Sequence, residues 1–417
     1  MIRLPAASDP EVSVIVLLDG AVELAERALR ALAASDPGVA TEVVLLLNDP
    51  GEELEEFVRG STTGGKVVLC RANAGPGVGW NLGTAVAAAP RLMTMHEDSE
   101  PQPGWLRPLC ETMEETGAGA VGARLFNADG SVQNCGWVLF SDAAHQTITA
   151  ATAPEVVAAG EPTPADMLSG AAMLVDREAA EAAGGWDERF HPAVYMDIDI
   201  STAMWSLGRP VLSVPGSRVV HASGTFDSRP DSLVTGPRLR LFLFERNRHL
   251  FTDKWPFVRD LAEAPTDAEP KTIRDAVQAA LVHTRARWER VRAGEAPPTP
   301  APRPEPRFTG VVPEPVIADG EGSYRVAPEV ESALRAAERE LTDEYLRWLI
   351  GREDEVSGHL AEAHDALAHQ RRDIETLNQA IEDLRRHNQE LSTTLDGLLT
   401  SRTWRLRTRA ARLLGRD

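Results

Sequence analysis

Residues 12–18 read VSVIVLL, and residues 42–47 read EVVLLL. Both are short runs of β-branched residues or Leu, which is typical of strands buried on both faces of a parallel sheet. Residues 21–34, between them, are rich in Ala and Leu with helical spacing, and further apolar runs follow at Lys66 to Cys70 and Arg91 to Met95. Strands that alternate with helices predict a doubly wound α/β fold, in which ligands bind beyond the carboxyl ends of the strands.

The length, net charge and cysteine content of the chain exclude several classes of protein. With 417 residues, the chain is long enough for more than one structural unit. Its net charge of -20 argues against a general nucleic-acid binder, because phosphate binding needs a cationic surface. The three cysteines lie far apart, which argues against a disulfide framework and a structural zinc site. We expect no signal peptide and no membrane-spanning helix, and hence a cytoplasmic protein.

The pattern of the chain changes after about residue 255, so we expect residues 1–255 to form the α/β domain. Residues 256–327 read as a helical segment followed by a Pro-rich linker, which is clearest at GEAPPTPAPRPEP in 294–306. Residues 328–400 read as an amphipathic helix and a coiled coil, and residues 401–417 as a basic amphipathic tail.

A heptad pattern runs through residues 360–398. Asn388 stands at an a position, where a buried amide fixes register and favours two strands, so we expect a homodimer. The a positions are followed three residues later by the d positions: Leu360, Leu367, Ile374, Ile381, Asn388 and Leu395 at a; Ala363, Gln370, Leu377, Leu384, Leu391 and Leu398 at d.

The tail at 401–417 reverses the charge of the chain, with six arginines against a single acidic residue, Asp417. Trp404 and several leucines accompany the arginines, as in helices that lie on an anionic membrane surface. A cationic helix end that pairs with the acidic body is an equal alternative. The first interpretation would place the protein on the inner face of the plasma membrane.

Several polar motifs lie where predicted strands end. NAGPGVGWNLG at 73–83 joins a strand to a helix, and its glycines would let the backbone approach a ligand closely. The acidic cluster in MHEDSEPQPGWL, residues 95–106, would suit a hard cation such as Mg²⁺ or Mn²⁺ that neutralises a diphosphate. A solvated acidic loop is the alternative. GGWDERF at 184–190 and YMDIDI at 195–200 add further acids, and VVH ends another strand at His221.

Taken together, these motifs resemble the inverting family 2 glycosyltransferases, which have the GT-A fold, over residues 12–255. The resemblance rests on eight motifs in the family's order, including GAAMLV at 170–175, and the exit RNRHLF at 246–251 is also similar. Within that family, the chain resembles a rhamnosyl- or galactosyltransferase-like branch. It implies transfer of a sugar, with inversion, from a nucleotide-diphospho-sugar to a hydroxyl of a saccharide or a lipid-linked acceptor. The tail at 401–407 resembles a motif of cell-envelope enzymes, which implies a role in envelope polysaccharide synthesis.

The resemblance also implies roles for individual residues. Asp98 and His221 would hold the divalent cation, Mn²⁺ or Mg²⁺, and Asp197 would be the catalytic base that deprotonates the acceptor. The remaining implied contacts are Asn48, Asn73, Gly75, Asn81, Glu97 and Asp98 on the donor side and Trp186, Asp187 and Asp199 on the acceptor side.

Three positions depart from the family pattern. His96 replaces the first Asp of the D-x-D motif, Met196 replaces the Glu before the base, and Leu47 replaces an Asp that often holds the nucleoside. The degenerate metal motif keeps open a non-catalytic scaffold or a sugar-nucleotide-sensing subunit. A nucleotidyltransferase would need a Gly-rich N-terminal loop with a basic residue, which the sequence lacks.

Overall fold

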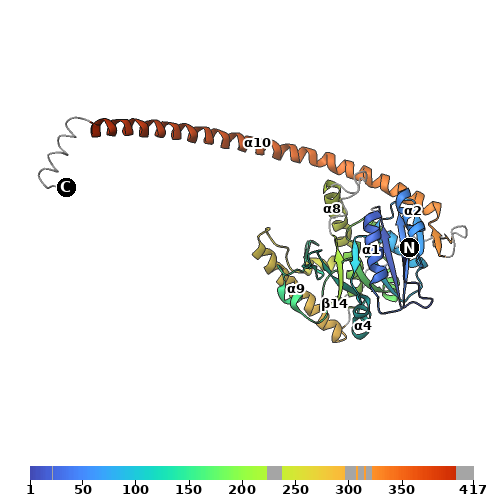
Figure 1. The fold of residues 1–417 in the computed structure, drawn as a ribbon. Coiled ribbons are helices and arrows are strands. Elements are labelled where there is room, and N and C mark those ends of the chain that lie inside the picture. The colour runs from blue at the N-terminus through green and yellow to red at the C-terminus, as the bar shows by residue number, and fades with distance from the viewer. Residues whose placement is uncertain (21, 223–236, 296–306, 309–313, 316–321, 401–417) are drawn as a thin grey trace. The chain divides into compact units, whose positions relative to one another are not determined.

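The computed structural model describes residues 1–20, 22–222, 237–295, 307–308, 314–315 and 322–400 (Figure 1). The chain divides into two compact units, Met1–Tyr345 and the part from Leu346 onward. The first unit contains all of residues 1–255, and the predicted end of the α/β domain at residue 255 stays a prediction. Residues 401–417 lie outside the described part, so the membrane interpretation of the basic tail stays a prediction.

A single large sheet organises the first unit, in the order β12-β14-β8-β13-β6-β2-β3-β5-β16-β15. The central strands β6, β2, β3 and β5 are parallel, as are β8 and β14, whereas β13 is antiparallel between β6 and β8. The strand bounds along this order are Thr163–Pro164, Val211–His221, Ala120–Phe126, Ala172–Asp176, Arg91–His96, Val12–Leu18, Thr41–Asn48, Lys66–Cys70, Ser323–Arg325 and Glu314–Pro315.

Helices cover both faces of this sheet. Every residue of β2 is buried, and alternate side chains enter opposite cores: Ile15 packs in one, and Val14 and Val16 in the other. Such two-sided burial explains why the strand is continuously apolar instead of alternating. The helices on the side of Val14 are α1 (Val22–Ala34), α2 (Glu52–Ser61) and α4 (Leu106–Thr116), and those on the side of Ile15 are α3 (Gly75–Val86), α6 (Arg177–Ala183) and α7 (Met196–Ser206).

Smaller elements complete the first unit. The short strands are β1 (Ile2–Arg3), β4 (Thr62–Thr63), β7 (Ser99–Pro101), β9 (Val132–Asn134), β10 (Trp137–Leu139) and β11 (His145–Thr147), and the remaining helices are α5 (Pro154–Ala158), α8 (Pro237–Lys254) and α9 (Pro270–Arg292). The mostly parallel sheet, the flanking helices and the helical C-terminal region confirm the fold class expected from the sequence.

One long helix, α10 (Pro328–Thr400), begins in the first unit and forms the described part of the second. The helix is confirmed, whereas its pairing as a coiled coil stays a prediction. Leu377, Ile381, Leu384 and Leu391, all at predicted a or d positions, are 45–65% exposed in the single chain. Among the described residues, no helix is both long enough and apolar enough to cross a membrane.

Candidate active site

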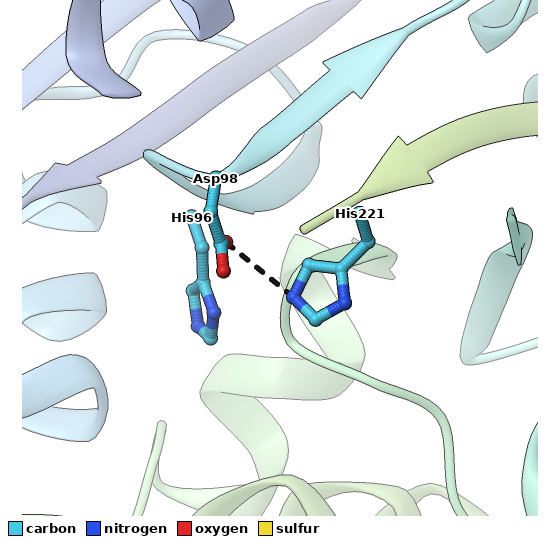
Figure 2. A group of neighbouring side chains, drawn as sticks. All are labelled: His96, Asp98 and His221. Atoms are coloured by element: carbon cyan, nitrogen blue, oxygen red, sulfur yellow. Dashed lines mark ion pairs between the residues drawn. The ribbon is translucent and has the colours of Figure 1, made fainter. Parts of the chain in front are cut away.

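The predicted metal ligands come from two strands that pairing brings together. β6 ends at His96, the chain turns through Asp98, and β7 then pairs antiparallel with the end of β14, with Ser99 opposite His221. The amide of Ala222 also donates to the carbonyl of Asp98 at 3.0 Å. This pairing holds His221 Nε2 3.4 Å from Asp98 Oδ1 (Figure 2). The structure thus brings together the two residues predicted to bind the cation.

His221 is oriented by Gln133 on β9. Gln133 Nε2 donates to the carbonyl of His221 at 2.9 Å and to Asn127 Oδ1 at 3.0 Å, so Gln133 Oε1 is left as an acceptor. His221 Nδ1 lies 2.8 Å from that oxygen and is the donor. In a neutral imidazole, Nε2 then carries the lone pair. A lone pair that faces the Asp98 carboxylate is favourable only when a cation or a proton lies between them.

The third member of the group is His96. Its ring stacks on Trp80, with 5.7 Å between the centroids and 11° between the planes. Burial lowers the pKa of His96 to about 4, so the ring is neutral near pH 7 and can act as a ligand. Its Nε2 is buried and has no hydrogen-bond partner among the described residues.

Together, His96, Asp98 and His221 could hold a metal ion, because their ligand atoms lie within 4.8 Å of one another (Figure 2). The residues fit a divalent cation: one carboxylate, one imidazole lone pair fixed by Gln133, and a second imidazole with a buried, unpartnered nitrogen. From the sequence, we expect that His96 removes an acidic ligand from the metal site. In the structure its side chain lies in the group and can replace that ligand.

Asp197 lies in the first turn of α7 and is held by the turn before β13. The backbone N–H of Gly170 donates to Asp197 Oδ2 at 3.1 Å, whereas Oδ1 has no partner among the described residues. Burial raises the pKa of Asp197 to about 6, although the hydrogen bond from Gly170 opposes this effect. A carboxylate with that pKa is mostly ionised at pH 7 and remains basic enough to accept a proton.

A chain of contacts links Asp197 to the metal group. A Cβ on Gly170 would lie 2.1 Å from Trp80 Cη2 and 2.9 Å from Asp197 Oδ1. Trp80 in turn stacks on His96, and its ring centroid lies 5.6 Å from that of Trp186. The indole nitrogens of Trp80 and Trp186 are also buried without partners among the described residues. Unpartnered buried polar groups that cluster in this way are characteristic of sites that bind a ligand.

On the donor side, the end of β3 is bonded to the loop before α3. Asn48 accepts a hydrogen bond from the amide of Ala74 at 2.7 Å, and its amide group lies 3.2 Å from both Asn73 Oδ1 and Asp19 Oδ1. Gly75 has a φ of 62°, and a Cβ there would meet the carbonyl oxygen of Pro192 at 1.9 Å. Three of the residues predicted to bind the donor, Asn48, Asn73 and Gly75, therefore lie together where β3 ends and α3 begins.

The other two residues predicted only for the donor side have structural partners. Asn81 bonds both backbone groups of Trp186, with its amide donating to the carbonyl at 2.8 Å and its oxygen accepting from the N–H at 3.0 Å. Glu97 accepts hydrogen bonds from the amides of Asp19 and Gly20 at 2.7 and 3.3 Å. Asn81 and Glu97 thus hold neighbouring loops in place through hydrogen bonds to their backbone groups.

The two acids predicted on the acceptor side, Asp187 and Asp199, meet at the end of α8. Lys254 Nζ lies 2.9 Å from Asp187 Oδ2 and 2.8 Å from Asp199 Oδ2, and the indole of Trp255 donates to Asp199 Oδ1 at 2.8 Å. Arg189 adds further hydrogen bonds to Asp187. Burial opposes ionisation of Asp187, but the Arg189 hydrogen bonds and the Lys254 charge leave its pKa below the ordinary value. The structure therefore pairs Asp187 and Asp199 with Lys254, whereas no cationic side chain pairs with Asp197 among the described residues.

The sequence is similar to one family of known proteins. Residues 13–181 match the family model described as Glycosyl transferase family 2. The matched family 2 segment contains Asn48, Asn73 and Asp98, and the match supports the glycosyltransferase superfamily expected from the motifs. Asp197 and His221 lie beyond its end.

Two solved structures are similar to this chain. One is described as "Crystal structure of GalNAc-T7 with UDP, GalNAc and Mn2+", with 16% identity and a TM-score of 0.43 over 64% of this chain and 55% of that one. The other is the mannosyltransferase PcManGT from Pyrobaculum calidifontis in complex with GDP-Man and Mn2+, with 15% identity and a TM-score of 0.38 over 70% of this chain and 81% of that one. The chain thus spans about half the length of the first. No curated protein matches the sequence significantly.

Sequence reasoning missed four residues that shape the site: Asp19, Trp80, Gln133 and Gly170 in its role beside Asp197. Trp80 lies inside the Gly-rich motif, and an aromatic residue among glycines was a usable signal. Gln133 gave no signal, because only the antiparallel pairing of β9 with β8 brings it to His221.

Proposed function

We propose that this chain is an inverting glycosyltransferase that moves a sugar, a hexose by the resemblance, from a nucleotide-diphospho-sugar to a hydroxyl of a saccharide or a lipid-linked acceptor. The observation that carries the proposal is the contact chain from Asp197 through Gly170 and Trp80 to His96. It joins a buried carboxylate of raised pKa to a group that could hold a metal ion. The family 2 match over residues 13–181 supports the reaction class.

In this proposal, each group of the site has a defined task. His96, Asp98 and His221 hold a divalent cation, which when bound stabilises the negative charge of the departing diphosphate. Asp197 Oδ1 takes the proton from the acceptor hydroxyl as that oxygen forms its bond to the anomeric carbon. The bond from the anomeric carbon to the diphosphate oxygen breaks in the same step, so the configuration inverts. The loop of Asn73 and Gly75 shapes the nucleotide side, and Trp186 shapes the acceptor side.

The test is a donor panel with the full-length protein. UDP-, GDP- and dTDP-sugars are incubated with Mn²⁺, with and without simple glycosides, and both transfer and donor hydrolysis are measured. NMR of any product compares its anomeric configuration with that of the donor. Turnover with inversion supports the proposal, and retention contradicts the direct displacement. Nucleotide binding without hydrolysis or transfer would instead favour the sensing or scaffold alternative, which the degenerate metal motif keeps open.

We also propose that the enzyme is a homodimer through α10 and that it acts in cell-envelope polysaccharide synthesis. The dimer is supported by the heptad pattern and by the exposure of Leu377, Ile381, Leu384 and Leu391 in the single chain. The envelope role and a peripheral place on the inner face of the plasma membrane are supported by the basic tail at 401–417 alone.

A further inference from the structure

The chain beyond the Pro-rich linker returns to the catalytic unit. β16 adds to the sheet in parallel with β5, with Tyr324 opposite Val68 and Arg325 opposite Leu69. The amide of Val326 then donates to the carbonyl of Leu69 at 3.0 Å, and α10 begins two residues later. A segment distant in sequence therefore becomes the neighbour of β5, the strand that leads into the donor loop.

The first turns of α10 pack firmly on the unit. Their buried side chains lie three or four residues apart, which is the spacing of one helix face. Full burial of each aliphatic side chain stabilises the packed state, so this part of the helix has a fixed place within the unit. The buried residues are Val330, Leu334, Ala337 and Leu341.

Beside this apolar stripe, two polar side chains of α10 contact the backbone of Arg71. β5 ends at Cys70, so the backbone groups of Arg71 lie beyond the ladder that pairs the strand. Glu331 Oε1 accepts the N–H of Arg71 at 2.8 Å, and Arg335 donates to its carbonyl. Two side chains of α10 thus satisfy the backbone groups of Arg71, which would otherwise require water or another partner.

Arg71 lies two residues before Asn73, at the start of the loop proposed to bind the donor. Asn73 Oδ1 accepts the N–H of Gly75 at 3.0 Å, and the carbonyl of Asn73 lies 2.8 Å from His191 Nε2. The ring of Phe308, which also follows the linker, lies 5.4 Å from that of His191. The segment after the linker therefore supports this loop at its start through α10 and near Asn73 through Phe308 and His191.

We propose that Glu331 and Arg335 are positioning residues for the donor nucleotide. By holding both backbone groups of Arg71, they fix the conformation of residues 71–75, so that the loop is preformed when a nucleoside diphosphate arrives. The inference rests on the proposed function, which assigns this loop to the donor. With this role, the start of α10 belongs to the donor site. The same helix continues into the predicted coiled coil.

Matched variants of the full-length chain test this role. Glu331→Ala and Arg335→Ala each remove one contact, whereas Glu331→Gln keeps an oxygen that can accept the N–H of Arg71. Glu329→Ala and Arg339→Ala are the controls, because both side chains are exposed on the same helix. The binding of UDP, GDP and dTDP, each with Mn²⁺, is measured by calorimetry, and hydrogen exchange of residues 71–75 is followed without nucleotide.

We expect Glu331→Ala and Arg335→Ala each to weaken nucleotide binding by about threefold to tenfold, the effect of losing one hydrogen bond made by a charged side chain at the surface. Glu331→Gln should recover most of that loss, the controls should bind as the wild type does, and kcat at saturating donor should stay within about threefold. Exchange at 71–75 should become faster in the two Ala variants. Unchanged affinity and exchange would overturn the positioning role while leaving the proposed function intact. A wild-type chain that binds none of the nucleotides would overturn the proposed function and this inference together.

Discussion

Gly170 donates its backbone N–H to Asp197 Oδ2 at 3.1 Å, and its missing side chain leaves room for the edge of Trp80. One residue thus fixes the proposed base and also allows an aromatic ring to lie against it. Trp80 is fully buried and packs on both His96 and Trp186, so it cannot move aside easily.

Replacing Gly170 by Ala should therefore impair both folding and transfer. The new Cβ would lie 2.1 Å from Trp80 Cη2, and such overpacking in a core costs about 1–3 kcal/mol. We expect a lower Tm and at least a 100-fold loss of transfer, because a misplaced base loses its alignment with the acceptor. Gly60→Ala on α2 is the control: apart from its chain neighbours and the backbone of its own helix, no described residue comes within 4 Å of its Cβ position, and its Tm should not fall. Equal behaviour of the two variants would contradict the role of Gly170.

Asp197→Asn should lower transfer by about 10²- to 10⁴-fold and leave nucleotide binding intact. Burial raises the pKa of Asp197 to about 6 in the folded chain, so the folded state holds the proton more tightly than the unfolded state does. The stability that this carboxyl contributes therefore falls as the pH rises from 3.8 to about 6 and is absent at pH 7, so the Asn variant should have a higher Tm at pH 7. In the wild type, the transfer rate should fall tenfold per pH unit below about pH 6.

Asp199→Asn is the contrasting variant. It removes one of the two carboxylates around Lys254, and an incompletely compensated buried charge costs about 3–5 kcal/mol. Its Tm should drop where that of Asp197→Asn rises. A larger loss of turnover in a well-folded Asp199→Asn protein than in Asp197→Asn would assign the base to Asp199 instead.

Gln133→Leu should weaken metal binding without touching a ligand. The variant loses the acceptor for His221 Nδ1, so the imidazole can rotate and change tautomer. We expect Mn²⁺ affinity to fall about 10- to 100-fold, as measured by the electron paramagnetic resonance signal of free Mn²⁺. Gln146→Leu, on β11, should bind Mn²⁺ as the wild type does. Wild-type affinity in Gln133→Leu would mean that His221 needs no such support.

The two imidazoles of the group should make the site prefer Mn²⁺ to Mg²⁺, because imidazole suits the softer ion better. His96→Asp adds a hard carboxylate ligand, and the ratio of Mg²⁺ to Mn²⁺ affinity should rise by about tenfold or more. Titration calorimetry with each ion gives the ratio directly. Asp98→Ala should remove binding of both ions, and excess EDTA should stop transfer. Full activity in EDTA would refute the metal assignment.

Truncation after residue 355 should yield a monomer whose first unit remains folded, because that unit ends at Tyr345. Light scattering of the full-length chain should give a dimer. Leu384→Asp, at an exposed d position of α10, should also give monomers, whereas a charge at the polar position Gln389 should not. Monomers of the unaltered full-length chain would rule out the coiled coil.

The sequence alone determined the α/β class and the central strands, because strands buried on both faces need continuous apolar runs such as VSVIVLL. It also determined that residues 328–400 are helical, because period and composition are local properties. The tertiary structure decided which polar groups meet. Gln133 reaches His221 through strand pairing, Lys254 comes from a distant helix to hold Asp187 and Asp199, and the start of α10 reaches Arg71 across 260 residues of sequence. Such contacts depend on how elements pack, and a local pattern of side chains carries no information about a partner that only packing brings near.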